Sequence, residues 1–265
     1  MNVVLKYPGA KNRLASWILE YIPEHEVYLE PYFGSGAVFF NKQPARIETI
    51  NDLNVDVVNY FRVLRDNKDE LISALRLTPY ARDEYEAAYK ISDKDSDAER
   101  ARKFAVRCWQ GFGCSNLYKN GFRSSQQGSS PATTKAWREY PETLQLANKR
   151  LLQAQIENLP AVELIKRYDT EDVFIYADPP YLQGTRKNYL YRHEMKDCEH
   201  EELICLLKKH PGKVLLSGYD NDMYNSCLKE WSKVSKNTTV EKGLRRTENL
   251  WMNYEPSAKQ IYLFS

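Results

Sequence analysis

Short apolar runs of strand length alternate along this chain with stretches that have helical periodicity. The strand-like runs lie at 27–30, 47–50, 155–159, 173–177, 214–217 and 261–264, and the clearest helical patterns lie at 11–22, 37–41 and 55–64. Parallel strands need a crossover connection between them, usually a helix, so this alternation predicts a mostly parallel sheet covered by helices. We therefore expect an α/β fold with a Rossmann-like sheet.

From about residue 66 to 150 the strand pattern fades and helical periodicity takes over. This change predicts two domains: residues 1–62 and 151–265 together form the sheet, and residues 63–150 form a mainly helical insert. A polar stretch at 124–134 is rich in Ser, Gln and Thr, and we expect it to be a mobile loop within the insert.

The insert has an uneven distribution of charge. Residues 100–138 contain no Asp or Glu, but they contain eight Lys or Arg residues and the aromatic residues Trp109, Phe112, Tyr118, Phe122 and Trp137. Basic side chains neutralise phosphates and aromatic rings stack on bases, so this mixture favours nucleic-acid binding. The alternative is a solvated helical face followed by a flexible loop.

The overall composition is that of an ordinary globular protein, with 42% hydrophobic and 28% charged residues in a chain of 265. No apolar run approaches the roughly 20 residues that a membrane span needs. The first eight residues lack the pattern of a signal peptide, and five cysteines without a Cys-x-x-Cys pair fit reduced thiols. We expect a cytoplasmic protein that does not cross a membrane.

Two histidines and two cysteines near residue 200 raise the question of a zinc site. His193, Cys198, His200 and Cys205 are separated by spacings that match none of the usual closed zinc sites. We therefore predict that no metal takes part.

A glycine-rich turn follows the strand predicted at 27–30. Gly34 and Gly36, on either side of Ser35, let the backbone approach a ligand closely. Asp52 ends the next predicted strand, where its carboxylate can accept hydrogen bonds from both hydroxyls of a ribose. Together these residues suggest a cofactor that contains adenosine, whereas the alternative is a tight turn and a helix-capping Asp.

The strongest local signal is Asp178-Pro179-Pro180-Tyr181, directly after the apolar run 173–177. Neither Pro179 nor Pro180 has an N–H, so the backbone carbonyls there can turn outward and accept a hydrogen bond. The Asp178 carboxylate is a second acceptor, and the Tyr181 ring offers a face on which a planar base can stack. The alternative is a strand-ending Pro-Pro turn with a capping Asp.

Two acceptors beside a stacking ring suit an aromatic amine. Such an amine is a poor nucleophile because its lone pair is delocalised, and accepting hydrogen bonds from its protons helps to localise that pair. S-adenosylmethionine already carries a good leaving group, so the protein's main tasks are positioning and electrostatics. The amine can then attack the sulfonium methyl in line.

These residues resemble the Dam-type, D12-class DNA adenine methyltransferases, and the resemblance extends over nearly the whole chain. The similar motifs are Lys6-Tyr7-Pro8-Gly9-Ala10-Lys11, Glu30-Pro31-Tyr32-Phe33-Gly34-Ser35-Gly36, Asn51-Asp52-Leu53-Asn54 and the tetrapeptide that begins at Asp178. The resemblance implies a site-specific enzyme that transfers a methyl group from S-adenosylmethionine to the 6-amino nitrogen of adenine in double-stranded DNA.

The resemblance also implies roles for single residues. Tyr7 packs on the cofactor, Lys11 meets its carboxylate, Asp52 binds the ribose, and Asp178 lies between the methionine moiety and the target amine. Asn158 falls where the family often has an Asp that contacts the cofactor adenine. Gly34 and Gly36 belong to the cofactor loop, and Pro179 and Tyr181 complete the catalytic tetrapeptide.

In this family the insert is the target-recognition domain, with a hairpin that enters DNA. Asn120-Gly121 is a two-residue turn signal, and we expect Lys119, Phe122 and Arg123 beside it to contact DNA. Arg123 is the expected base reader, because a planar guanidinium can bind guanine through two hydrogen bonds. Segments 217–221 and 251–254 resemble family positions of the target pocket, and the alternative is a buried turn and a core Trp.

Other functions remain open at this point. An acid-Pro-Pro-aromatic tetrapeptide also serves methyltransferases that act on RNA or on protein glutamine, and a DNA-binding relative without turnover would keep the fold. A dinucleotide-dependent oxidoreductase fits the glycine turn, but position 39 is Phe, so the full Gly-x-Gly-x-x-Gly pattern is missing. The sequence also leaves open a restriction endonuclease partner, the recognition sequence and the oligomeric state.

Overall fold

The structure is a computed structural model, and it describes residues 2–113, 118–125, 133–185, 191–239 and 245–256. Its centre is a seven-stranded sheet with the strand order β3-β2-β1-β4-β5-β7-β6. The strands are β1 (Val27–Glu30), β2 (Ile47–Asn51), β3 (Ala154–Glu157), β4 (Val173–Ala177), β5 (Val214–Tyr219), β6 (Ser232–Thr239) and β7 (Arg245–Met252). Strands β1 to β5 pair in parallel, and β7 runs antiparallel to both β5 and β6. The predicted α/β Rossmann-like sheet is confirmed.

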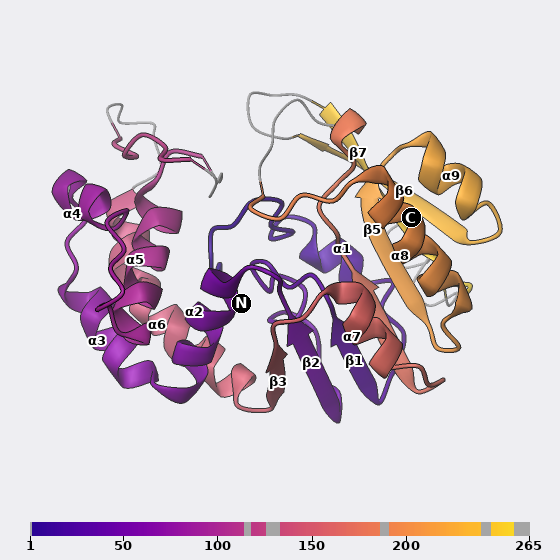
Figure 1. Cartoon of the computed structure of the whole chain (residues 1–265), viewed down its shortest axis with the longest axis horizontal. Helices are drawn as coiled ribbons and strands as arrows, with labels where there is room; N and C mark the ends of the chain where they lie inside the picture. Colours follow the sequence, from indigo (N-terminus) through magenta and orange to yellow (C-terminus); the bar gives the residue numbers. More distant parts are fainter. Residues whose placement is uncertain (1, 114–117, 126–132, 186–190, 240–244, 257–265) are drawn as a thin grey trace.

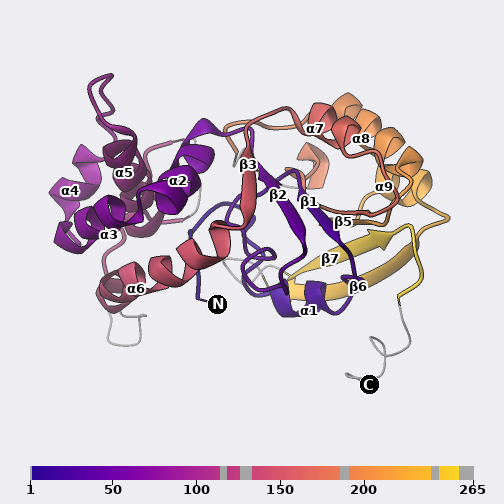
Figure 2. The same ribbon diagram turned by 90° about the horizontal axis from the view of Figure 1, so that it is seen from below.

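The central strand β4 is buried on both faces. Phe174 and Tyr176 pack into one hydrophobic cluster, and Val173, Ile175 and Ala177 pack into another, because successive side chains of a strand point to opposite faces. Figure 2 shows helices α7 (Ala161–Arg167), α8 (Asp197–Lys209) and α9 (Asp222–Cys227) along one face and α1 (Ala15–Leu19) against the other. In the described ranges, no helix is long and apolar enough to cross a membrane.

A helical layer separates β2 from β3 in the sequence. It consists of α2 (Val55–Asp66), α3 (Lys68–Leu77), α4 (Arg82–Ala87), α5 (Asp97–Gln110) and α6 (Thr133–Leu151), which lie beyond the β3 edge of the sheet in Figure 1. Helix α2 packs on both α5 and α6, and the Asn148 amide of α6 donates hydrogen bonds to the carbonyls of Leu64 and Arg65 at the end of α2. The functional division at 63–150 stays a prediction.

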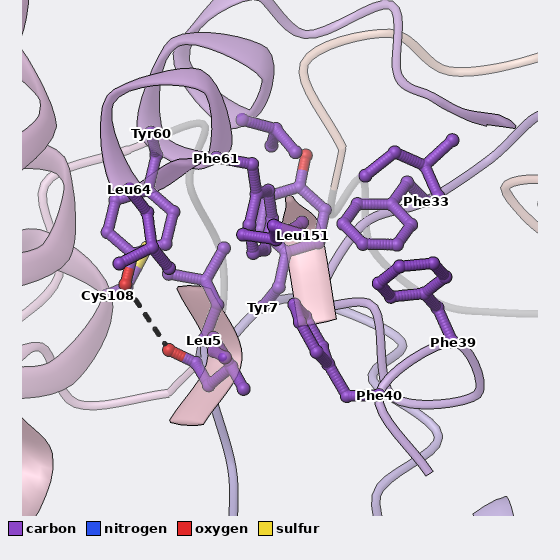
Figure 3. Close-up of a cluster of buried hydrophobic side chains, with 14 of the residues drawn as sticks. Leu5, Tyr7, Phe33, Phe39, Phe40, Tyr60, Phe61, Leu64, Cys108 and Leu151 are labelled. Carbon is purple, nitrogen blue, oxygen red and sulfur yellow. Dashed lines mark hydrogen bonds between the residues drawn. The ribbon is translucent and has the colours of Figure 1, made fainter. Parts of the chain in front are cut away.

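The glycine turn after β1 leads into single turns rather than the helix predicted at 37–41. Gly36 adopts a φ of 67°, and the chain continues through isolated bonds such as Phe40 N–H to the Gly36 carbonyl at 2.9 Å. Phe33, Phe39 and Phe40 pack together beside Phe61 of α2, as Figure 3 shows. Because burying these rings stabilises the turn, aromatic packing outweighs helical propensity here.

Other elements also differ from the sequence-based expectation. Helix α1 covers only the middle of the predicted 11–22, and the preceding residues form turns. Strands β6 and β7 were not predicted. The sequence of β6, Ser-Lys-Val-Ser-Lys-Asn-Thr-Thr, is polar and lacks an apolar pattern, which an edge strand tolerates. The strand predicted at 261–264 lies outside the described residues.

Candidate active site

Acidic residues follow three neighbouring strands at the same edge of the sheet. Glu30 ends β1, Asp52 follows β2, and Asp178 follows β4. Strand β1 lies between β2 and β4 and pairs in parallel with both, so their carboxyl ends meet where the strand order reverses, the usual ligand position in open α/β sheets. All three acids line a cleft of about 880 Å³, including space open to solvent.

The Asp52 carboxylate is fixed by the backbone of the glycine turn. Its Oδ2 accepts a hydrogen bond from Gly34 N–H and its Oδ1 accepts one from Asn54 N–H, both at 2.8 Å. Burial raises the pKa of Asp52 to about 6, although these two hydrogen bonds act in the opposite direction. Asp52 therefore carries a negative charge at neutral pH that a bound group with hydroxyl donors can use.

Tyr7 forms one wall of the cleft. Its hydroxyl accepts a hydrogen bond from the Asn54 amide at 3.2 Å, and its ring lies against Gly34, where an added Cβ would meet the ring at 3.2 Å. Gly34 also has a φ of 51°, which a residue with a side chain rarely adopts. Tyr7, Phe33 and Phe40 belong to the same buried cluster, which Figure 3 shows. The predicted residues Tyr7, Gly34 and Asp52 thus lie together.

Lys11 and Asp178 form a close ion pair. The Lys11 ammonium donates to both Asp178 carboxylate oxygens at 2.7 Å and to the Gly9 carbonyl at 3.1 Å. Burial disfavours the charged form of Lys11, but the charges of Asp178 and Glu248 outweigh it, and the pKa of Lys11 is raised. Ser217 of β5 donates a third hydrogen bond, to Asp178 Oδ1 at 2.8 Å.

Glu248 of β7 is a site residue that sequence reasoning missed. It is 3% exposed, accepts a hydrogen bond from the Tyr181 hydroxyl, and lies 3.8 Å from the Lys11 ammonium. Burial raises the pKa of Glu248, whereas the positive charge of Lys11 lowers it. The Tyr181 ring meets Tyr219 edge-on at 4.5 Å between centroids, so Glu248 and Tyr219 together fix the Tyr181 ring.

Glu30 is the first residue of the glycine-turn motif, and the sequence analysis assigned it no role. It is buried and accepts a hydrogen bond from the Tyr28 hydroxyl at 2.7 Å. Burial raises the pKa of Glu30 to about 8, so its carboxyl is mostly protonated at neutral pH. The cleft therefore contains a neutral acid beside the charged Asp178.

The remaining tetrapeptide and cofactor positions lie around this centre. Pro180 lines the cleft, and Pro179 is buried next to it. Gly36 adopts its positive φ against Phe33 and Phe40. The Asn158 side chain donates to the Asp52 backbone carbonyl at 2.7 Å and is exposed. Asn158 is thus near Asp52 but does not line the cleft.

The predicted DNA-contacting residues lie on a hairpin of the insert and do not line the active-site cleft. Phe112 N–H donates to the Gly121 carbonyl at 2.7 Å, and Arg123 N–H donates to the Gln110 carbonyl at 2.8 Å. Gly121 lacks the positive φ that a two-residue turn requires, so the Asn120-Gly121 turn prediction was wrong. Within the described part of this hairpin, the glycine with a positive φ is Gly113, next to Phe112 on the opposite strand from Gly121.

The three hairpin side chains have different surroundings. Phe122 packs between the rings of Tyr80 and Tyr85, at centroid distances of 5.3 and 5.9 Å. Arg123 donates from Nε to the Gly111 carbonyl at 3.2 Å. Lys119 is half exposed and lies 3.9 Å from Glu86. Lys119 is therefore the most accessible of the three, and the Phe122 ring supports the hairpin.

The histidines and cysteines considered for zinc do not assemble. Within the described ranges, no three His, Cys, Asp or Glu side chains are grouped to hold a metal ion. His200 is buried and its Nδ1 lies 2.8 Å from the Tyr224 hydroxyl, while Cys198 and Cys205 are exposed. The prediction that no metal takes part in the reaction is not tested by this arrangement.

Two residues of segment 217–221 contact the candidate site, whereas Trp251 is a core residue. Ser217 bonds to Asp178, and Tyr219 contacts Tyr181. Trp251 is 1% exposed and packs edge-on against Tyr224 in the hydrophobic cluster beneath α8 and α9. The core position expected for Trp251 as the alternative is therefore confirmed, and the role of segment 217–221 in a target pocket stays a prediction.

Residues 7–243 match the D12 class N6 adenine-specific DNA methyltransferase family. The type II methyltransferase M.MjaIII of Methanocaldococcus jannaschii is 24% identical over 287 residues, which cover 94% of this chain and 98% of that protein. The type II methyltransferase M1.LlaDCHI of Lactococcus lactis subsp. cremoris is 29% identical over 211 residues, 71% of this chain and 69% of that protein. The DNA adenine methylase of Escherichia coli K12 is 32% identical over 72 residues, 27% of this chain and 26% of that protein.

The matched range spans all three strand-end acids, Lys11 and the tetrapeptide that begins at Asp178. It also decides against the interpretation as a dinucleotide-dependent oxidoreductase, which had no use for the tetrapeptide. The chain belongs to the D12 class N6 adenine-specific DNA methyltransferases, and the family implies S-adenosylmethionine as its methyl donor.

Proposed function

We propose that the cleft binds S-adenosylmethionine through Tyr7, Lys11, Gly34, Gly36 and Asp52, and that Asp178-Pro179-Pro180-Tyr181 holds an adenine extruded from double-stranded DNA. The observation that carries this proposal is the position of Asp178, which shares one cleft with Asp52 and lies beside Lys11 and Ser217. The cofactor's chemistry is to supply a methyl group activated by a positively charged sulfur.

The residues of the cleft fit this cofactor. Gly34 lets the backbone lie directly against the Tyr7 ring, which an added Cβ would crowd at 3.2 Å. The negatively charged Asp52 can accept hydrogen bonds from two hydroxyl groups, as a ribose requires. Asn158 contacts the Asp52 backbone, so we assign it an indirect role through Asp52.

The hydrogen bonds of Asp178 explain how it can act on an amine. A carboxylate offers about four acceptor positions. Lys11 uses two of them and Ser217 uses a third, so about one remains for an N–H of the adenine amine. Accepting that hydrogen bond localises the nitrogen lone pair, which forms the new bond to carbon as the sulfur–carbon bond breaks. The surplus proton on the nitrogen leaves through the same carboxylate oxygen to solvent.

The substrate assignment is tested by mass spectrometry of nucleosides. Purified protein and S-adenosylmethionine are incubated with unmethylated double-stranded DNA, with RNA, or with a mixture of proteins. We expect 6-methyladenine in DNA only. Methyl groups in RNA or on glutamine, with none in DNA, would reject the proposed substrate. Mapping the modified adenines then gives the recognition sequence.

Asp52→Asn is expected to weaken S-adenosylmethionine binding about tenfold or more, because hydrogen bonds to a charged group contribute about 1.5–3 kcal/mol each. Glu157→Gln is the matched control, since Glu157 ends the adjacent strand β3 and does not line the cleft. Isothermal titration calorimetry measures both variants. Equal affinity of wild type and Asp52→Asn would remove Asp52 from the binding site.

The pKa of Asp52 also sets a pH dependence. Because this pKa is raised from 3.8 to about 6, Asp52 takes up a proton in the folded protein between about pH 6 and 4, before the unfolded chain does. Its contribution to stability therefore increases as the pH falls through that window. Cofactor affinity should fall in the same window, because it needs the carboxylate, and Asp52→Asn should show a flatter profile.

We further propose that the insert, residues 63–150, contacts DNA through Lys119 and Arg123. The support is the absence of acids from residues 100–138 and the exposure of Lys119, Phe112 and Tyr118 around the hairpin. Arg123→Ala is expected to relax discrimination at one base pair, at a cost of about 1–3 kcal/mol. Competition binding with single-substitution duplexes measures this, and unchanged discrimination would exclude Arg123 as a base reader.

A restriction endonuclease partner is a second proposal, supported by two similar proteins that are themselves described as type II methyltransferases. In that case the methylated sequence matches the cutting site of an endonuclease that works alongside this enzyme. DNA methylated to completion should then resist that endonuclease, and cleavage of fully methylated DNA would reject the pairing.

A further inference from the structure

A second cleft lies between the helical insert and the start of α2. Its volume is about 650 Å³, including open solvent, and its walls include Asp56, Tyr89, Arg107, Lys119 and Arg192. Asn54 lines both this cleft and the active-site cleft. The two clefts therefore adjoin at Asn54.

Two guanidinium groups in this cleft share a single acid. Arg107 and Arg192 both donate to Asp56 Oδ2, at 3.1 and 3.4 Å. The side chains of Asp56 and Arg107 are 10% and 13% exposed, whereas Arg192 is 49% exposed. One carboxylate balances only one of the two positive charges, so this group keeps a net positive charge.

The arginines also keep donors for another acceptor. A guanidinium has five N–H donors, and each of these two uses one on Asp56. The Arg107 guanidinium lies 5.8 Å from the ring centroid of Tyr89 and 5.6 Å from that of Phe104. These rings hold its plane and exclude water from it, which strengthens hydrogen bonds to an anion.

The two arginines come from different parts of the chain. Arg107 belongs to α5 of the insert, which packs on α2 (Figure 1). Arg192 lies after the catalytic tetrapeptide, next to His193 and Glu194 of the active-site cleft. An anion held by both would therefore tie the insert to the segment that borders the reaction site.

We propose that Arg107 and Arg192 bind a phosphodiester group of the DNA strand that carries the target adenine, beside the extruded nucleotide. This inference rests on the proposed function. A phosphodiester offers two unesterified oxygens, which suit the forked donors of arginine. Extruding a base costs a few kcal/mol, and a phosphate contact next to the base helps to offset that cost only once the strand has moved into the cleft.

The test compares Arg192→Gln with Arg76→Gln. The Arg76 side chain is 50% exposed, similar to that of Arg192, and it pairs with the exposed Glu142. Arg76→Gln therefore removes one positive charge, as Arg192→Gln does, and serves as the matched control. Fluorescence anisotropy with double-stranded DNA at several salt concentrations measures affinity without any turnover. We expect Arg192→Gln to weaken binding about fivefold to tenfold and to reduce the slope of log affinity against log salt by about one.

Three further readouts separate phosphate binding from a structural role. The KM for DNA should rise by more than kcat falls, S-adenosylmethionine affinity should stay at the wild-type value, and Arg192→Lys should recover part of the salt slope. Arg107→Lys is a second variant that keeps the buried charge, and it should weaken DNA binding because lysine cannot bind a phosphate through a fork.

Either of two results would overturn the inference: a salt slope equal to that of Arg76→Gln, or a loss of cofactor affinity as large as the loss of DNA affinity. Failure of the proposed function looks different, because wild-type protein would then form no 6-methyladenine in DNA. The binding measurement does not depend on that outcome.

Discussion

Asp178→Ala is expected to lower kcat for adenine methylation by about a hundredfold to a thousandfold or more. The substitution removes the acceptor for the adenine amine and frees the Lys11 ammonium from its two shortest hydrogen bonds. Glu248 remains 3.8 Å from that ammonium, so Lys11 keeps a counter-charge and the fold is expected to survive. Nucleoside mass spectrometry after a single turnover measures the loss.

Asp220→Ala is the matched control for this experiment. Asp220 follows β5 as Asp178 follows β4, but its side chain is 58% exposed and pairs with Lys233. It should retain wild-type activity. Comparable activity of Asp178→Ala and wild type would remove Asp178 from the reaction, whereas absence of activity in wild type as well would favour a non-catalytic DNA-binding relative.

The predicted parts of the fold are those whose buried pattern is continuous. The run 173–177 is apolar on both faces and forms β4, the strand that carries the catalytic tetrapeptide. Strand β7 escaped prediction because Glu248 and Asn249 interrupt it, although both are buried. A buried acid or amide needs a hydrogen-bond partner. The partners here are Tyr181 for Glu248 and Ser235 for Asn249, and both lie on other segments of the chain.

Some residues of the candidate site lie in recognisable motifs, whereas others do not. Asp52 and Asp178 each lie in a motif whose local sequence already indicates a ligand, and the family resemblance adds Lys11. Glu248 has no such motif, because a Glu in a polar strand normally faces water. Only the pairing of β7 with β5, which sets Glu248 opposite Tyr219, brings it to Tyr181.

The turn predicted at Asn120-Gly121 was wrong because contacts with other segments outweigh the local turn propensity. The dipeptide is a strong local signal for a two-residue turn, yet the Gly121 carbonyl accepts from Phe112, and Tyr85 donates its hydroxyl to the Asn120 carbonyl at 2.6 Å. These contacts to residues outside the dipeptide, together with packing of Phe122 on Tyr80 and Tyr85, fix the backbone. Local turn propensity yields to them because each adds burial or a hydrogen bond.

Charge balance around Lys11 predicts a second large effect. When both carboxyls are ionised, Asp178 and Glu248 carry two negative charges against the one positive charge of Lys11, which leaves a net charge of minus one. That charge favours the positively charged sulfur of S-adenosylmethionine over the neutral sulfur of the product, S-adenosylhomocysteine. We expect Glu248→Gln to reduce this preference about fivefold to tenfold, on the order of 1 kcal/mol at the effective dielectric of a protein interior.

Two substitutions distinguish charge from orientation. Glu248→Gln keeps an oxygen that can accept the Tyr181 hydrogen bond, whereas Glu248→Ala loses both the acceptor and the charge. We expect Glu248→Ala also to lower kcat, because the Tyr181 hydroxyl then loses the acceptor that helps to orient its ring. Glu255→Gln is the control, since Glu255 is exposed and bonds to Ser232. Calorimetry with both ligands and single-turnover kinetics give the two readouts.

The pH dependence decides whether the charge of Glu248 matters. Burial raises the pKa of Glu248, so it becomes neutral at a higher pH than an exposed Glu as the solution is acidified. The wild-type preference for S-adenosylmethionine should therefore decline as the pH falls, while Glu248→Gln should show a smaller decline because it has no proton to take up there. If the preference for S-adenosylmethionine changes with pH in the same way in wild type and Glu248→Gln, Glu248 acts only by orienting Tyr181. If Glu248→Gln and Glu248→Ala both keep the wild-type preference for S-adenosylmethionine, Glu248 does not belong to the site.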